Sequence, residues 1–303
     1  MSTGSESNDL LFLENTSVAY GDLVILHDID LRMQKGEFCT VVGPSGCGKS
    51  TLLRLVLGQQ RATSGRLLLN GHPLGRADPT RGIVFQHYSL FPHLTVLQNV
   101  IQGHVLPGLP FFLRGAKRRR VEAEAMAYLD EAGIADQAKK YPHQLSGGQK
   151  QRAAIIQAIL THPDIVLMDE PFSALDPGTR EDMQQLLLRL WIEHDLTVLF
   201  VTHDLEEAVF LGTRLIALSK YYSDGRSASP DQHGARIVVD LMLRERNLLP
   251  DATIKSEAKF AKLIEQIKNQ AFDPEAFQHV LTHDLSHPDA YFTLDDIQAR
   301  QPS

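Results

Sequence analysis

A chain of 303 residues is longer than most single domains, so we expect one large domain with an appendage. Its formal net charge of −7 argues against a nucleic-acid binder, whose phosphate contacts need a surplus of Lys and Arg. Its two cysteines, Cys39 and Cys47, are too few for a disulfide framework or a zinc site and fit a reducing cytoplasm.

No apolar run approaches the roughly 18 residues that a bilayer-spanning helix needs. The N-terminal residues are polar and lack the charged-then-apolar pattern of a signal peptide. We therefore expect that the chain does not cross a membrane by itself. The one basic cluster, Lys117 to Arg120, is interpreted as the solvated start of a helix.

The first part of the chain is predicted to contain strands and hairpins. Between residues 10 and 40, short apolar runs alternate with turn residues, which is typical of antiparallel strands. A buried strand over Phe38 to Val42 ends in glycine and precedes a helix over Lys49 to Gly58. A further hairpin is predicted from Gly65.

The middle of the chain is predicted to be helical from Leu94 to about Leu160, with a long polar helix around Arg118 to Ala132. Two short apolar strands, Ile165 to Met168 and Thr197 to Val201, flank a helix from Pro177 to His194. This alternation predicts an α/β core with a parallel sheet, in which the helical stretch is an inserted subdomain.

After about Lys220 the composition shifts toward Ser, Gly, Asp and Pro, which indicates a loop or linker. Ile237 to Leu243 is a candidate strand. Ser256 to Phe272 is predicted to be a helix capped by Ser256. The apolar positions at helical spacing in this segment are Phe260, Leu263, Ile264 and Ile267.

Three histidines near the C-terminus, His279, His283 and His287, are spaced at i, i+4 and i+8. On a continuous helix they would share a face that could bind a metal. Because Pro288 follows at once and no second cluster is evident, we interpret the segment as a polar or fraying helical tail. A regulatory tail is also possible, but no residue identifies an effector.

The segment GPSGCGKST contains the phosphate-loop pattern G-x-x-x-x-G-K-[ST]. Its glycines let backbone N–H groups curl around phosphate oxygens, Lys49 brings a positive charge to the β- and γ-phosphates, and the Ser50 hydroxyl coordinates Mg²⁺. The helix that starts there adds its positive dipole end. By itself the motif leaves kinases, GTPases and other NTPases open. The residues predicted to bind the nucleotide are Gly43, Pro44, Ser45, Gly46, Cys47, Gly48, Lys49, Ser50 and Thr51.

Downstream, the sequence IVLMDE predicts a buried strand that delivers two adjacent carboxylates at its end. Asp169 would bind Mg²⁺ directly or through water. Glu170 would orient and polarise the attacking water, a role typically worth about 10²- to 10⁴-fold in rate. The two motifs together predict a metal-assisted NTPase site.

A third motif, LSGGQKQR at Leu145 to Arg152, lies between these two. Ser146, Gly147 and Gly148 at a helix start make a second anion-receptive group of N–H donors. With the other two motifs, this segment closely resembles the ABC ATPase family over about residues 10 to 220. The resemblance implies a head-to-tail dimer, in which Ser146 to Gln149 of one chain close on the γ-phosphate that the other holds.

Four further positions match that family. Tyr20 lies where the family has an aromatic residue that stacks on adenine. Gln86 matches a glutamine that senses Mg²⁺ beside the contact with the membrane partner, and Asp176 belongs to the loop that communicates between opposed chains. His203 matches the histidine that contacts the γ-phosphate and the catalytic water. The resemblance thus implies ATP and Mg²⁺ as cofactors, a metal site of Ser50, Gln86 and Asp169, and catalysis by Lys49, Gln86, Glu170 and His203.

We predict an ABC ATPase domain over residues 10–222. It would have a P-loop core with a mostly parallel sheet, an antiparallel β subdomain and a helical subdomain at about 88–160. Residues 223–303 are predicted to be a linker and a partly helical C-terminal extension. Because no internal repeat is evident, we expect no tandem second nucleotide domain.

Three functions are open to a chain that resembles this family. It could power an importer that has a separate permease and a solute-binding protein, power an exporter of the same architecture, or act in translation or DNA repair. The segment Ser89 to Val100 favours the importer, since it looks like the part of importer ATPases where a permease docks. Soluble relatives usually carry tandem domains, zinc motifs or coiled-coil insertions, which this sequence lacks. The importer reading implies a peripheral protein at the cytoplasmic face of the inner membrane.

The sequence of the core most resembles those of the nitrate, sulfonate and taurine importer group. Cargo is selected by the binding protein and the permease, so the residues of the ATPase do not encode it. The C-terminal segment from Tyr221 to Asp240 is expected to depart from those relatives, which leaves a urea- or amide-linked importer open as well.

Cys47 lies at a predicted helix N-terminus beside Lys49, so we expect its thiol to have a lowered pKa. This leads to the hypothesis that alkylation inhibits the ATPase and that ATP protects it. The alternative is a small residue that the loop merely tolerates.

Overall fold

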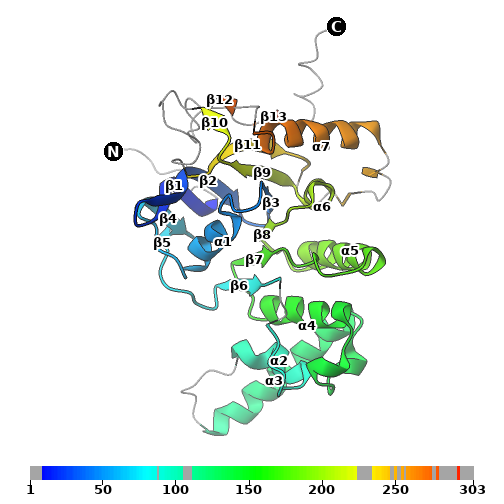
Figure 1. Cartoon of the computed structure of the whole chain (residues 1–303). Coiled ribbons are helices and arrows are strands. Elements are labelled where there is room, and N and C mark those ends of the chain that lie inside the picture. The colour runs from blue at the N-terminus through cyan, green and yellow to red at the C-terminus, as the bar shows by residue number, and fades with distance from the viewer. Residues whose placement is uncertain are drawn as a thin grey trace. The chain divides into compact units, whose positions relative to one another are not determined.

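The computed structural model describes residues 9–86, 89–104, 111–223, 234–245, 249–250, 254–255, 257–274, 278–279 and 292–293. The chain divides into two compact units (Figure 1). The core unit comprises residues 1–77 and 195–303, and the helical unit comprises residues 78–194.

An antiparallel sheet of order β2-β1-β4-β5 opens the core unit. Asn70 and Gly71 both have positive φ, as the two-residue turn between β4 and β5 requires and as Asn-Gly pairs favour. The sheet confirms the predicted hairpins. Its strands are β1 (Asp9–Tyr20), β2 (Leu23–Gln34), β4 (Ser64–Leu69) and β5 (His72–Pro73).

A second group of strands in the core unit is mainly parallel. β3 lies between β8 and β9 and is parallel to both, and β11 pairs antiparallel with β9. All five residues of β3 are buried, as expected of a strand covered on both faces. This arrangement confirms the predicted α/β fold. The strands are β3 (Phe38–Val42), β8 (Val198–Val201), β9 (Arg214–Ser219) and β11 (Arg236–Met242), and the helices are α1 (Lys49–Leu57), α6 (Leu205–Leu211) and α7 (Ala258–Ala271).

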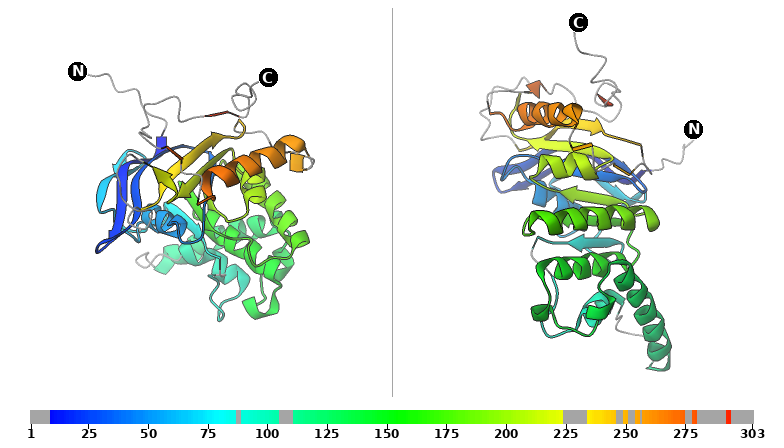
Figure 2. Two further views of the ribbon diagram at one scale, coloured as in Figure 1. Left: turned by 45° about the horizontal axis from the view of Figure 1, so that its top comes forward. Right: turned by 90° about the vertical axis from the view of Figure 1, so that its right-hand side faces the viewer.

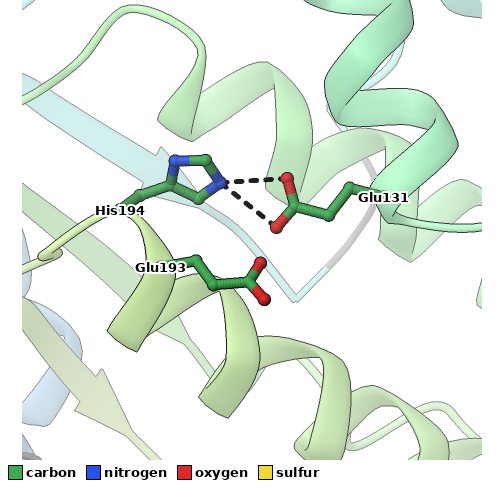
Figure 3. A group of neighbouring side chains, drawn as sticks. All are labelled: Glu131, Glu193 and His194. Atoms are coloured by element: carbon green, nitrogen blue, oxygen red, sulfur yellow. Dashed lines mark hydrogen bonds and ion pairs between the residues drawn. The ribbon is translucent and has the colours of Figure 1, made fainter.

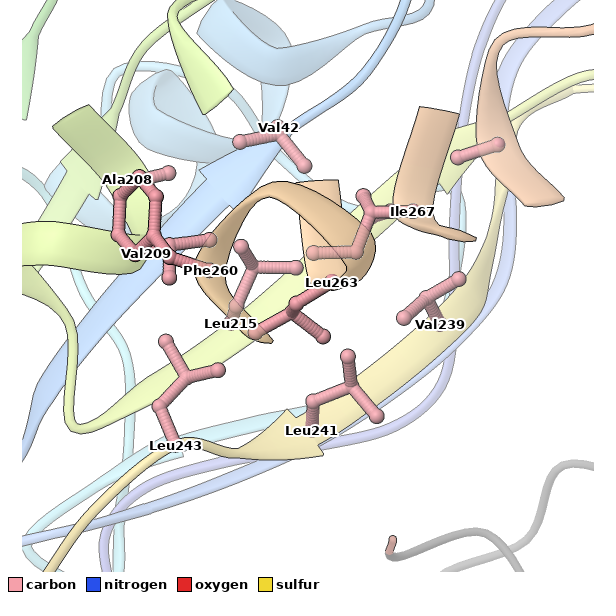
Figure 4. Close-up of a cluster of buried hydrophobic side chains, with 12 residues drawn as sticks. Val42, Ala208, Val209, Leu215, Val239, Leu241, Leu243, Phe260, Leu263 and Ile267 are labelled. Atoms are coloured by element: carbon pink, nitrogen blue, oxygen red, sulfur yellow. The ribbon is translucent and has the colours of Figure 1, made fainter. Parts of the chain in front are cut away.

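Helix α7 lies along β11 and β9 in the core unit (Figure 2). Its residues Phe260, Leu263 and Ile267 are buried against Leu215 and Leu241, within a larger apolar cluster (Figure 4). The predicted strand and helix of the C-terminal extension are thus confirmed. The N-cap position of α7 is Glu257 instead of the predicted Ser256, which lies outside the described residues.

A buried ion pair also joins β11 to β9. The Arg214 guanidinium donates to both Asp240 carboxylate oxygens at 2.6 Å, and it lies 3.3 Å from Glu37. The Arg214 and Asp240 side chains are only 5% and 1% exposed. Because breaking such a pair leaves a buried charge, β11 is held to the core unit by charge as well as by apolar contacts.

The helical unit contains two parallel strands and most of the helices in the described part of the chain. The predicted polar helix begins earlier than expected, at Phe111, so the exposed basic cluster at residues 117–120 lies within the helix and not at its start. The elements are β6 (Arg81–Val84), α2 (Val96–Val100), η1 (Ile101–His104), α3 (Phe111–Glu131), η2 (Ala135–Gln137), η3 (Pro142–Gln144), α4 (Gly147–Ile159), β7 (Ile165–Asp169) and α5 (Pro177–Glu193).

The remaining described residues form short strands. His279 belongs to the two-residue strand β12 (Gln278–His279), which pairs with β10 (Tyr222–Ser223), so no helix runs through His279. His283 and His287 lie outside the described residues. The strand β13 (Phe292–Thr293) pairs with β11. Among the described helices, none combines the length and the apolar character needed to span a membrane.

Candidate nucleotide-binding site

The phosphate-loop segment connects β3 to α1 in the core unit. Gly43, Gly46 and Gly48 all have positive φ, at 151°, 75° and 102°, which bends the backbone in a way that glycine permits. A Cβ on Gly43 would lie 2.1 Å from the Leu218 carbonyl oxygen, so this position also needs glycine for space. The glycines of the motif therefore shape the loop that precedes α1.

Lys49 is the first residue of α1, and its side chain turns back over the loop. Its Nζ donates to the carbonyl oxygens of Gly43 at 2.7 Å and of Pro44 at 3.1 Å. Although Lys49 is buried, its ammonium group therefore has partners within the loop. This places a positive charge at the curled backbone, as a phosphate site needs. Ser50 and Thr51 follow in the first turn of α1, and Ser45 and Gly46 are exposed.

Cys47 is a correction to the sequence expectation. The residue is buried, and this burial raises the pKa of its thiol, although Lys49 acts in the opposite direction. The desolvation of the thiolate outweighs the nearby positive charge. The predicted lowering of the Cys47 pKa is therefore wrong.

Tyr20 ends strand β1 and is 48% exposed, while its hydroxyl donates to Gln60 Oε1 at 2.9 Å. The same β1–β2 hairpin contacts the phosphate loop, because a Cβ on Gly48 would lie 2.8 Å from a methyl group of Leu26. An exposed aromatic ring on a hairpin that packs against the loop suits a stacking role for a base.

His203 lies between β8 and α6, with an exposed side chain. Its two neighbours are anchored: Thr202 Oγ1 donates to Glu207 Oε2 at 2.6 Å and accepts from the Asp204 backbone N–H at 3.1 Å. The Asp204 carboxylate in turn caps α6 by accepting from Glu206 and Glu207. Sequence reasoning missed Thr202 and Glu207. The spacing T-H-D-x-x-E at residues 202–207 was the sequence feature that could have indicated this hydrogen-bonded pair.

Asp169 ends β7 in the helical unit, and Glu170 follows it; both are partly exposed. Glu170 has a φ of 46°, which is uncommon for a residue other than glycine. Its carbonyl oxygen accepts from the backbone N–H of Ser173 at 3.3 Å and from the Ser173 hydroxyl at 3.0 Å. The adjacent carboxylates thus sit at a sharp, internally hydrogen-bonded turn.

The segment LSGGQ forms the start of α4. Ser146 is the N-cap: its hydroxyl accepts from the Gln149 N–H, and the Gln149 side chain accepts from the Ser146 N–H. Gly147 is exposed, and Gly148 packs so closely against Thr179 that a Cβ would lie 2.6 Å from its methyl group. The predicted helix start with its dipole end is therefore present.

Two further predicted residues belong to the helical unit. Asp176 caps α5, and hydrogen bonds from Thr179 lower the pKa of its carboxyl group, which favours the charged form. Gln86 is exposed and follows β6 by two residues. The core unit thus carries Tyr20, the loop and His203, and the helical unit carries the other predicted residues. Their roles in binding and catalysis stay predictions.

Comparison with known proteins identifies the family. Residues 26–173 match the ABC transporter family. The chain is 45% identical over 199 residues to a nitrate import ATP-binding protein of Synechocystis. This alignment covers 66% of the chain and 72% of that protein. The chain belongs to the ABC transporter ATP-binding family. Proteins of this family hydrolyse ATP to drive transport, so the predicted ATPase activity is confirmed.

A second relative of this ABC ATPase matches over more of the chain. It is a taurine import ATP-binding protein of Roseobacter denitrificans, to which the chain is 38% identical over 274 residues. This alignment covers 88% of the chain and 95% of that protein. So long a match must extend well past residue 222. How closely the segment from Tyr221 to Asp240 matches these relatives is not given by an overall identity, so the expected departure there stays a prediction.

The fold of this ABC ATPase is also found among solved structures. A dimeric structure of a bacterial ABC transporter cassette is similar with a TM-score of 0.61 and 31% identity. The similarity covers 78% of this chain and 99% of that one. The predicted P-loop ATPase fold is confirmed by this similarity.

Proposed function

We propose that the chain is the ATP-binding subunit of an importer, which hydrolyses ATP as a head-to-tail dimer to drive a separate permease. The observation that carries the dimer is that each chain has two helix starts suited to phosphate, at α1 and at α4. The similar solved cassette is dimeric. The two relatives named above are both import proteins, and this favours import over export.

In the proposed dimer, the loop Gly43 to Thr51 holds the triphosphate and Lys49 neutralises its terminal phosphates. Tyr20 stacks on adenine. Ser146 to Gln149 of the second copy close on the γ-phosphate, where the N–H groups at the start of a helix stabilise negative charge. The Asp176 loop then lies at the junction between the copies.

The hydrolytic step is proposed to depend on one water molecule and one Mg²⁺ ion. Ser50, Gln86 and Asp169 offer hydroxyl, amide and carboxylate oxygens, and Mg²⁺ prefers oxygen ligands of this kind. Glu170 polarises the attacking water, which approaches the γ-phosphorus as the bond to the β-phosphate oxygen breaks. His203 is proposed to contact the γ-phosphate.

The proposed permease contact is the segment after Gln86. Phe91 is 45% exposed, although it is a large apolar residue. Buried Asn99 fixes this turn, because its side chain accepts from the Phe91 N–H and donates to the carbonyl oxygens of Phe91, Leu94 and Thr95. A rigid turn that presents an exposed aromatic side chain suits a docking surface. A permease docked there would hold the chain at the cytoplasmic face of the membrane, and a solute-binding protein would act through that permease.

Capture of the tagged chain from detergent-solubilised membranes tests this proposal. We expect an integral membrane protein to co-purify, and Phe91→Ala to reduce its recovery. Leu249→Ala is the matched control, since Leu249 is also exposed but lies in the core unit. Recovery without any membrane protein, or equal recovery with Phe91→Ala, would contradict the proposal.

A further inference from the structure

Three metal-ligating side chains outside the nucleotide motifs meet in the helical unit (Figure 3). Glu131 is the last residue of α3, Glu193 is the last residue of α5, and His194 is the C-cap of α5. Each offers one ligand atom, and these atoms all lie within 4.8 Å of one another. The His194 Nε2 atom lies 3.0 and 3.2 Å from the two Glu131 carboxylate oxygens.

Tyr128 holds the His194 ring in place. The two rings are stacked, with centroids 4.5 Å apart, and the Tyr128 hydroxyl lies 3.2 Å from Nδ1. Histidines that bind metals usually have their other ring nitrogen hydrogen-bonded to an outer partner, which fixes the tautomer and the orientation. Here Tyr128 occupies that outer position, so Nε2 is directed toward Glu131.

The surroundings favour a cation. Both α3 and α5 end at the cluster, and the carboxyl end of a helix carries partial negative charge. The ligand oxygens of Glu193 and Glu131 lie within 4.8 Å of each other. Two carboxylates this close repel each other, and a cation bound between them relieves that repulsion.

The spacing also fits a metal. In a tetrahedral zinc site with bonds of about 2.0–2.1 Å, two ligand atoms are about 3.3 Å apart. The Nε2–oxygen distances of 3.0 and 3.2 Å are close to this value. Glu193 is exposed, so its side chain can rotate to complete a three-ligand set.

We propose that Glu131, Glu193 and His194 bind a divalent transition-metal ion of the Zn²⁺ class, which links the end of α3 to the end of α5. One imidazole and two carboxylates favour Zn²⁺, Co²⁺ or Ni²⁺ over Mg²⁺ and Ca²⁺, which prefer oxygen ligands alone. Water fills the fourth position. The site is separate from the nucleotide motifs and does not depend on ATP hydrolysis.

Metal binding by the full-length chain, without a histidine tag and without nucleotide, tests the proposal. Every protein compared carries Gln in place of His279, His283 and His287, so that the C-terminal histidines cannot contribute. Calorimetry is expected to find one Zn²⁺ per chain, and Co²⁺ is expected to give the visible absorption of a tetrahedral site. Excess Mg²⁺ should not displace either ion.

Variants decide which residues hold the metal. Glu193→Gln and His194→Gln should each weaken Zn²⁺ binding by more than the roughly tenfold expected for Tyr128→Phe, which removes only an outer hydrogen bond. His162→Gln is the control, because His162 pairs with Glu124 nearby but is not a proposed ligand, and it should bind as the parent does. Since Glu193 is exposed, its variant should fold normally. No Zn²⁺ binding by the parent, or unchanged affinity in Glu193→Gln, would overturn the proposal.

Discussion

Glu170 leaves β7 with a φ of 46°, a conformation that costs a residue with a side chain on the order of 1 kcal/mol or more. The hydrogen bonds from Ser173 to the Glu170 carbonyl oxygen hold this turn. Residues held in sparsely populated backbone regions cluster at functional sites. This observation supports the proposed role of Glu170 independently of the motif.

Glu170→Gln tests that role. The amide keeps the size of the side chain but cannot act as a base, so phosphate release should fall by about 10²- to 10⁴-fold. ATP binding should persist, and the variant should form ATP-dependent dimers, which sedimentation would detect. Normal turnover by this variant would show that Glu170 is not the general base.

The reactivity of Cys47 can also be predicted. Because burial raises the pKa of its thiol, iodoacetamide should label Cys47 slowly in the folded chain at neutral pH. Labelling should be faster after unfolding in denaturant, because unfolding exposes the thiol to water and to the reagent and removes the desolvation that raises its pKa. Mass spectrometry of the Cys47 peptide measures both rates, and equal rates would contradict the burial.

At the scale of single residues, the sequence predicts the role of a residue where that role depends on a short local motif. The phosphate loop, the two carboxylates after β7 and the Ser146 cap all lie within short motifs. The burial of Cys47 could not be predicted from a local motif, because it depends on how the folded chain packs around the loop. For this reason the direction of the Cys47 pKa shift could not be predicted from the sequence. The hydrogen bond from Thr202 to Glu207 depends in the same way on the geometry of the two side chains.

Among the elements, apolar runs correctly predicted β3, β7 and β8, whose residues are almost all buried. Strand β6 was missed because only Ile83 and Val84 of its four residues are apolar, and Gly82 packs against the Ala158 carbonyl oxygen of α4. Strand β9 was missed as well, although all six of its residues are buried. Its place in the sheet depends on pairing with β3 and β11, which are distant in sequence.

The ion pair between β9 and β11 should matter to stability. Asp240→Ala would leave the buried Arg214 guanidinium without its main partner and should lower the free energy of unfolding by about 3–5 kcal/mol. Glu14→Ala, which breaks an exposed pair with Arg66, should cost at most about 1 kcal/mol. Urea denaturation compares the two variants. Equal effects would mean that the buried pair contributes little.

The packing of α7 can be tested in the same way. Ile267 is 0% exposed in the apolar cluster, so Ile267→Ala should destabilise the chain by about 2–5 kcal/mol. Lys268→Ala, at the next and exposed position, should change stability by less than about 0.5 kcal/mol. If thermal unfolding shifts equally in both variants, α7 is not packed as described.

At the scale of the whole molecule, the composition shift near residue 222 led to a predicted domain boundary there, and this boundary stays a prediction. The described residues beyond it pack into the core unit, where β11 pairs with β9 and α7 covers both strands. A loop-like composition marks the linker but cannot show that the chain returns to the same sheet. The family motifs were predictable because each is contiguous in sequence.

The proposed dimer makes ATP hydrolysis a property of two chains, because Ser146 to Gln149 of one copy complete the site of the other. The most direct test is the rate of phosphate release per chain, measured with Mg²⁺ and saturating ATP over a wide range of chain concentrations. We predict a specific activity that rises with concentration until all chains are paired. A specific activity that is the same at every concentration, down to concentrations where sedimentation finds only monomers, would contradict the account.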